Sequence, residues 1–123
     1  MSTLADIKGV GLGLKRELIP QIQSLYQASA GQKAIISNIN FVEIAPENWI
    51  GAGGKYAEDL AWFVDRYPIV CHGLCLSLGG PDPLNVAFLR QVKQFLSANK
   101  IPLYTEHLSY CSDNYHGKTG YLY

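Results

Sequence analysis

The sequence lacks an excess of charge of either sign and lacks any long hydrophobic run. Ten basic and ten acidic residues give a formal net charge of zero, so the composition provides no attraction for nucleic acid or an anionic membrane. No stretch of about 18 apolar residues is present, and the first residues, Met1 to Asp6, lack the basic and apolar regions of a signal peptide. We therefore expect a cytoplasmic protein that binds neither nucleic acid nor a membrane.

Cysteine is scarce and shows no metal-binding pattern. The three cysteines, Cys71, Cys75 and Cys111, form no CxxC pair, which favours reduced thiols, although a disulfide between two of them stays open. The sequence also lacks an HExxH motif and the residue order of a Ser-His-Asp hydrolase. These absences leave hydrolytic activity without support.

What the sequence does contain is a regular alternation of short apolar runs and amphipathic segments. This alternation is typical of an α/β protein built on a parallel sheet. Strands are predicted over residues 9–14, 40–46, 68–72 and 102–107, and helices over 16–28, 55–66 and 83–99. Asp82 is predicted to cap the last helix, with Pro83 at its first position and Val86, Leu89, Val92 and Leu96 on its inward side. Residues 110–123 are polar and predict a loop or a short hairpin.

Two of the predicted strands end in a histidine, His72 in one and His107 in the next. Because the carboxyl ends of parallel strands meet at one edge of the sheet, we expect the two side chains to converge there, at the mouth of a parallel barrel. Imidazole is a ligand for iron, zinc or copper. The alternative is a pair of polar side chains hydrogen-bonded at strand ends, and two histidines alone do not decide between these interpretations.

Carboxylates surround this predicted edge. Strand alternation would point Glu43 into the barrel interior, where it would need a partner. Glu47 is a candidate acid or ligand, and Glu106 points away from His107 or acts behind it. The glycine-rich loop 51–54 is either a connector or a substrate-facing loop, and His116 is expected in an exposed loop.

Several motifs together resemble one bacterial family. They are Gly9–Leu14, Phe41–Trp49, Gly51–Gly54, His72–Gly79, Asp82–Pro83 and Glu106–Ser109. The chain resembles, from about Gly9 to Tyr123, the multinuclear non-heme iron-dependent oxidative enzymes, long known only as an uncharacterised protein family and including the methanobactin-biosynthesis oxidase.

The resemblance implies a xylose-isomerase-like TIM barrel that binds two or three irons. Family members oxidise cysteines of ribosomal precursor peptides with dioxygen, and a partner protein usually presents the peptide. By this resemblance His72 and His107 are iron ligands, and Glu47 and Asn48 line the mouth in a substrate-binding or supporting role. Glu43 and Glu106 are further candidates for such roles.

The chain departs from the family in length. A complete barrel needs eight strand–helix units and about 250 residues, whereas residues 1–123 supply about four units. We therefore expect a single incomplete barrel domain, truncated before closure, that does not retain iron by itself and pairs with a missing C-terminal half or with itself. Two alternatives stay open: an inert or non-catalytic metal-binding fragment, and a divalent-metal isomerase on a similar barrel.

Overall fold

The computed structural model describes residues 2–28, 31, 34, 36–113 and 118–119. Its centre is a four-stranded sheet whose strands pair in sequence order. All three pairings are parallel, and the strands are β1 (Gly11–Gly13), β2 (Phe41–Ile44), β3 (Ile69–Gly73) and β4 (Leu103–Glu106). The predicted parallel α/β architecture is confirmed and is compatible with part of a barrel. The closed xylose-isomerase-like barrel stays a prediction.

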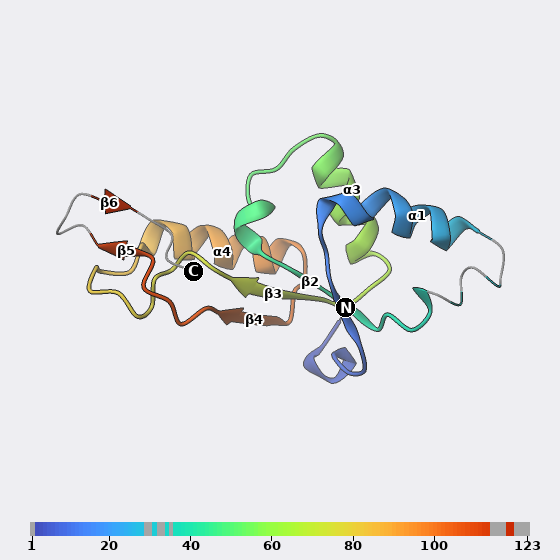
Figure 1. Cartoon of the computed structure of the whole chain (residues 1–123), viewed down its shortest axis with the longest axis horizontal. Helices are drawn as coiled ribbons and strands as arrows, with labels where there is room; N and C mark the ends of the chain where they lie inside the picture. The colour runs from blue at the N-terminus through green and yellow to red at the C-terminus, as the bar shows by residue number, and fades with distance from the viewer. Residues whose placement is uncertain (1, 29–30, 32–33, 35, 114–117, 120–123) are drawn as a thin grey trace.

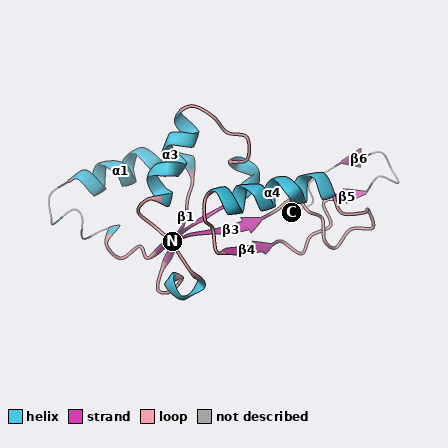
Figure 2. Ribbon diagram, turned by 180° about the vertical axis from the view of Figure 1, so that it is seen from behind, coloured by secondary structure: helices cyan, strands magenta, loops and turns pink. Residues whose placement is uncertain are grey.

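Within the described part of the chain, a helix follows each of the first three strands and packs on the sheet (Figures 1 and 2). The helices are α1 (Ile19–Gln27), α3 (Lys55–Val64) and α4 (Val86–Ala98), with short 3-10 turns η1 (Leu4–Asp6), η2 (Arg16–Leu18) and η3 (Pro46–Asn48). In both views α4 lies along β3 and β4, whereas α1 lies beside α3. Pro20 falls in the first turn of α1, where its missing N–H costs no hydrogen bond.

The packing of α1 on α3 is both aromatic and polar. The rings of Tyr26 and Trp62 meet edge to face with centroids 5.3 Å apart. Gln23 donates a hydrogen bond to the buried carboxylate of Asp59, which also pairs with Lys55 at 3.0 Å. Because these contacts join the helices that follow β1 and β2, they fix the positions of the loops at the carboxyl ends of those strands.

One face of the sheet carries the hydrophobic core. Val42, Ile44, Ile69 and Cys71 alternate toward the helices and are nearly inaccessible, and Phe63 of α3 is fully buried against this face. The register pairs Ile44 with Cys71 and Val42 with Ile69, so apolar side chains from neighbouring strands point to the same side. This burial accounts for most of the sheet's stability.

The opposite face is open at the carboxyl end of the strands. Glu43 and Thr105 on this face are exposed. The part of the chain that the structure describes places no cover over Glu43, so the prediction that Glu43 points into a barrel interior and needs a partner there stays a prediction. Its carboxylate is solvated, and no described residue makes a hydrogen bond to it.

The start of the last helix also differs from the prediction. The N-cap is Asn85, whose side chain accepts a hydrogen bond from the backbone N–H of Phe88 at 3.0 Å, and Asp82 and Pro83 lie before the helix. With this later start Val86 stands at the first position and is 53% exposed rather than inward, while Val92 is buried. The predicted end is confirmed at Asn99, which caps α4.

The polar segment after β4 forms the predicted hairpin. Strand β5 (Ser112–Asp113) pairs antiparallel with β6 (Lys118–Thr119). His116, predicted in an exposed loop, lies outside the described residues.

Candidate functional site

His72 stands near the end of β3, directly across from Thr105 of β4. Its Nδ1 lies 2.8 Å from Thr105 Oγ1, and that hydroxyl lies 3.4 Å from the carbonyl oxygen of Cys71. When Thr105 donates its proton to the carbonyl, Oγ1 accepts from an Nδ1–H on His72. In that tautomer the Nε2 lone pair is free, as a metal-binding imidazole requires.

His107 follows β4 immediately and extends its pairing with β3, because its backbone N–H donates to the carbonyl of Gly73 at 2.9 Å. The His72 and His107 rings lie with centroids 5.9 Å apart and planes at 39°. A metal ion bound to two imidazole nitrogens at about 2.1 Å would hold the ring centroids roughly 5–6 Å apart. The pair is therefore spaced so that both rings could bind one ion.

Among the described residues, no third metal-binding side chain lies beside the two histidines. Among the residues that the structure describes, no group of three or more His, Cys, Asp and Glu side chains is placed to hold a metal ion. The donor chemistry of the pair fits two positions of a coordination sphere. Two imidazoles alone do not complete a metal site, so a bound ion would need further ligands from other groups.

Glu47 lies in η3, after β2, and binds the loop that follows β3. Its Oε1 accepts hydrogen bonds from the backbone N–H groups of Leu74 at 2.8 Å and Cys75 at 3.1 Å. Its Oε2 is buried, and no described group bonds to it. Glu47 therefore holds the chain just after His72 and keeps one carboxylate oxygen uncommitted.

Glu106 points away from the histidine face, as strand alternation predicts for a neighbour of His107. Its Oε2 accepts from the hydroxyl of Tyr104, and its Oε1 from the backbone N–H of His107 at 3.2 Å. Burial, followed by the hydrogen bond to Glu106, raises the pKa of Tyr104, so the phenol stays protonated at neutral pH. Glu106 is thus positioned to orient the backbone at His107.

Gly73 leaves the space that the Tyr104–Glu106 pair occupies. A Cβ at Gly73 would overlap Glu106 Oε2 and lie 2.6 Å from the Tyr104 hydroxyl. We predict that Gly73→Ala lowers the free energy of unfolding by about 1–3 kcal/mol, because the hydrogen-bonded pair must move. Gly13→Ala is the matched control in a strand, since a Cβ there meets nothing within 4 Å. Urea denaturation would show the difference, and equal midpoints for the two variants would contradict it.

Cys71 faces the core, away from His72. Burial, and then the nearby carboxylates of Glu47 and Glu43, raise the pKa of its thiol to about 12. Cys75 and Cys111 are half-buried, and all three cysteines are free thiols.

Because the pKa of Cys71 is raised, its thiolate fraction at pH 8 is about a thousandfold below that of an ordinary thiol. We predict that iodoacetamide labels Cys75 and Cys111 in the folded protein while Cys71 reacts only after denaturation. Peptide mass mapping of native and denatured samples would measure this. Labelling of native Cys71 as fast as the other two would refute the buried assignment.

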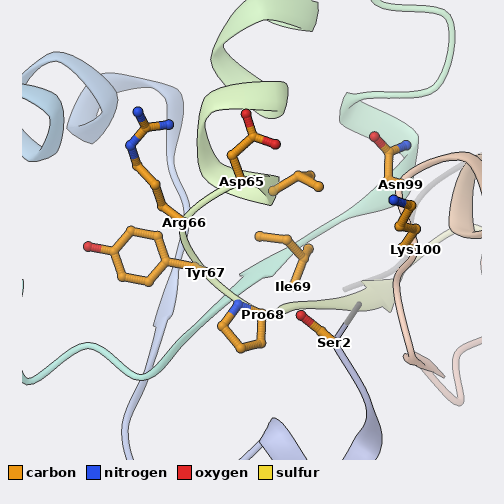
Figure 3. Close-up of a pocket in the computed structure, with 9 residues that line it drawn as sticks. Ser2, Asp65, Arg66, Tyr67, Pro68, Ile69, Asn99 and Lys100 are labelled. Carbon is orange, nitrogen blue, oxygen red and sulfur yellow. The ribbon is translucent and has the colours of Figure 1, made fainter.

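A separate cavity of about 300 Å³ lies at the opposite end of β3. Figure 3 shows Tyr67, Pro68 and Ile69 along its floor with Asn99 and Lys100 across from them. This is the amino end of the strands, where barrel proteins keep residues for stability rather than for catalysis. We therefore place the candidate site at the carboxyl edge.

The sequence did not indicate two features of this edge. The β3–β4 register sets Thr105 beside His72, and the sequence alone does not show this pairing. Arg16 follows β1 and contacts η3, because its guanidinium donates to the carbonyl of Asn48. The only sequence signals are weak ones: Thr105 is a polar residue within a predicted strand, and Arg16 is a polar residue shortly after one.

A parallel sheet with helices packed on it and two histidines paired at its carboxyl edge defines an α/β protein with a candidate site at that edge. A family profile described as "RiPP precursor modification enzyme MbnB/TglH/ChrH" matches residues 9–120, so the chain belongs to that family. The family resemblance drawn from the sequence motifs is confirmed.

Relatives in other bacteria carry only the name UPF0276 protein. Those of Nitrosospira multiformis, Alcanivorax borkumensis and Acinetobacter baylyi are 53%, 47% and 42% identical to the chain over 116, 116 and 120 residues. The matches cover 94%, 94% and 98% of this chain but 38%, 38% and 37% of those relatives. Within the described residues, no helix is both long and apolar enough to cross a membrane.

Proposed function

We propose that this chain forms the amino-terminal part of an iron-dependent oxidative enzyme that modifies cysteines of ribosomal precursor peptides, with His72 and His107 binding iron. The observation that carries the proposal is the pair of imidazoles with centroids 5.9 Å apart at the carboxyl edge. The family match supports the general kind of reaction.

In this proposal each residue of the edge has its own task. His72 binds the metal through Nε2 while Thr105 holds Nδ1, and His107 binds from the next strand. Glu47 fixes the loop after His72, and Glu106 orients the backbone at His107. Iron, when bound, supplies the redox chemistry with dioxygen. Glu43 and Asn48 line the solvent side of the edge, where they can meet a substrate.

The open face of the sheet supports the proposal that further polypeptide binds there. We propose that a segment equivalent to the remainder of the longer relatives, or a second copy of this chain, covers Glu43 and Thr105 and brings the further ligands. The substrate is a cysteine-containing precursor peptide, which a further protein presents, and the location is the cytoplasm.

A full-length chimera tests the function. This chain replaces the matching segment of the Nitrosospira multiformis relative, and the product is purified without oxygen and analysed for metal. We expect bound iron and dioxygen consumption in the presence of a cysteine-containing peptide. Activity with Mn²⁺ or Mg²⁺ and no oxygen uptake would favour an isomerase. Absence of any metal would favour an inert fragment.

A further inference from the structure

Arg16 is held as a fixed cation at the carboxyl end of β1. Its guanidinium carbon lies 4.0 Å from the centroid of the Tyr56 ring and 5.4 Å from that of Trp49. One Nη donates to the backbone carbonyl of Asn48. Stacking and this hydrogen bond together fix the plane of a side chain that is otherwise exposed and flexible.

The local chain path explains this placement. The backbone N–H of Leu14 donates to the carbonyl of Glu43 at 2.8 Å, which extends the β1–β2 pairing one residue beyond β1. Arg16 follows two residues later, in η2. The 3-10 turn η3, closed by the bond from Trp49 N–H to the carbonyl of Pro46 at 3.0 Å, brings Asn48 to the same point.

A cleft of about 330 Å³ opens beside this cation. The remaining guanidinium N–H groups have no partner among the described residues, so they are free to bind a ligand. The charged side chains of the cleft are Lys15, Arg16 and Glu17, which leave one net positive charge. A single bound carboxylate neutralises this one net charge and can pair with the fork of the guanidinium. The cleft is lined by Leu14, Lys15, Arg16, Glu17, Asn48 and Trp49.

The cleft lies at the carboxyl end of β1, two strands away in the sheet from β3, which carries His72. Neighbouring strands are about 4.8 Å apart, so the ends of β1 and β3 are separated by roughly 10 Å. An extended peptide advances about 3.4 Å per residue, which makes this gap about three residues long. Neither the family match nor the relatives' names assign a role to this place.

The geometry points to a carboxylate-binding subsite, in which Arg16, supported by Tyr56 and Trp49, binds a carboxylate of the peptide about three residues from the cysteine that reacts. The carboxylate is either the C-terminus or an acidic side chain. This inference rests on the proposed function for the identity of the ligand, but the subsite binds without metal and without turnover.

The test uses fluorescence anisotropy of this chain, without metal, with three labelled probes. The first is dansyl-Gly-Gly-Cys-Gly-Gly-Gly with a free C-terminus, the second is its amide, and the third is the amide with glutamate as the last residue; the dansyl label carries no carboxylate of its own. We expect the free acid, the glutamate amide or both to bind about tenfold tighter than the plain amide, since one charge-assisted contact is added. The probe that gains affinity identifies the source of the carboxylate.

Variants assign the effect to Arg16. Arg16→Ala should abolish the preference for the carboxylate, and Arg16→Lys should keep only part of it, because lysine loses the planar fork. Lys93→Ala removes one charge from the exposed side of α4 and should leave the preference intact. Circular dichroism verifies that the variants are folded.

Equal binding of all three probes would overturn the subsite, as would a preference that survives Arg16→Ala in a folded variant. The subsite would also be overturned if Lys93→Ala lost the preference for a carboxylate as fully as Arg16→Ala does, because the preference would then reflect the overall charge of the protein. None of these results depends on iron, so a failed subsite leaves the iron proposal standing, and a chimera without iron leaves the binding result standing.

Discussion

Replacing His72 or His107 with alanine in the full-length chimera is expected to weaken Fe²⁺ binding by about 100-fold or more. Each substitution removes one nitrogen donor, whereas loss of a group that merely supports a ligand costs about 10–100-fold. Anaerobic titration followed by elemental analysis after desalting measures the change. The two rings are 5.9 Å apart, so if they share an ion, each single variant should weaken binding of that same ion and the double variant should weaken it further.

Thr105→Val refines this prediction. The substitution keeps the shape of the side chain and removes the oxygen that lies 2.8 Å from His72 Nδ1. We expect a loss of about 10–100-fold in affinity, smaller than the loss for His72→Ala. Ser97→Ala, on the exposed side of α4, is the hydroxyl control and should change nothing. Unchanged iron affinity in both histidine variants would exclude the pair as ligands.

Replacing Glu47 with alanine should have the largest effect on folding among the polar substitutions at this edge. The variant loses two hydrogen bonds to a charged acceptor, one from the N–H of Leu74 and one from the N–H of Cys75. The expected loss is about 3–4 kcal/mol in the free energy of unfolding. Urea denaturation, read by far-ultraviolet circular dichroism, measures it.

Two carboxylate variants serve as comparisons for Glu47→Ala. Glu47→Gln keeps an acceptor oxygen for the two N–H groups and should cost about 1 kcal/mol. Glu43→Ala removes an exposed carboxylate to which no described residue bonds and should stay within about 0.5 kcal/mol of the parent. A stability loss in Glu47→Ala no larger than in Glu43→Ala would show that Glu47 does not hold the loop after His72.

The sequence predicted the features that depend on local pattern. The strands that end near His72 and His107, the parallel order and the end of α4 at Asn99 all follow from apolar runs and helix signals. The start of α4 could not be predicted in this way, because Asp82 and Asn85 are both good N-cap residues and only the folded loop selects Asn85. Local propensity cannot separate two caps three residues apart.

The missing parts of the site depend on contacts between distant segments. Thr105 gains its role from a register that joins it to a residue 33 positions away. Glu47 bonds to a loop 27 and 28 positions away. The exposure of Glu43 could not be predicted either, since its burial in a barrel depends on strands that the described residues do not supply. The roles of His72 and His107 as ligands stay predictions.

Anomalous diffraction at the iron edge tests most directly whether His72 and His107 bind iron. The crystals would contain the chimera loaded with Fe²⁺ without oxygen. We predict an iron peak between the two rings, with Nε2 of His72 and a ring nitrogen of His107 each about 2.1 Å away. An iron peak at another place, with neither imidazole bound to it, would show that the two histidines are not iron ligands.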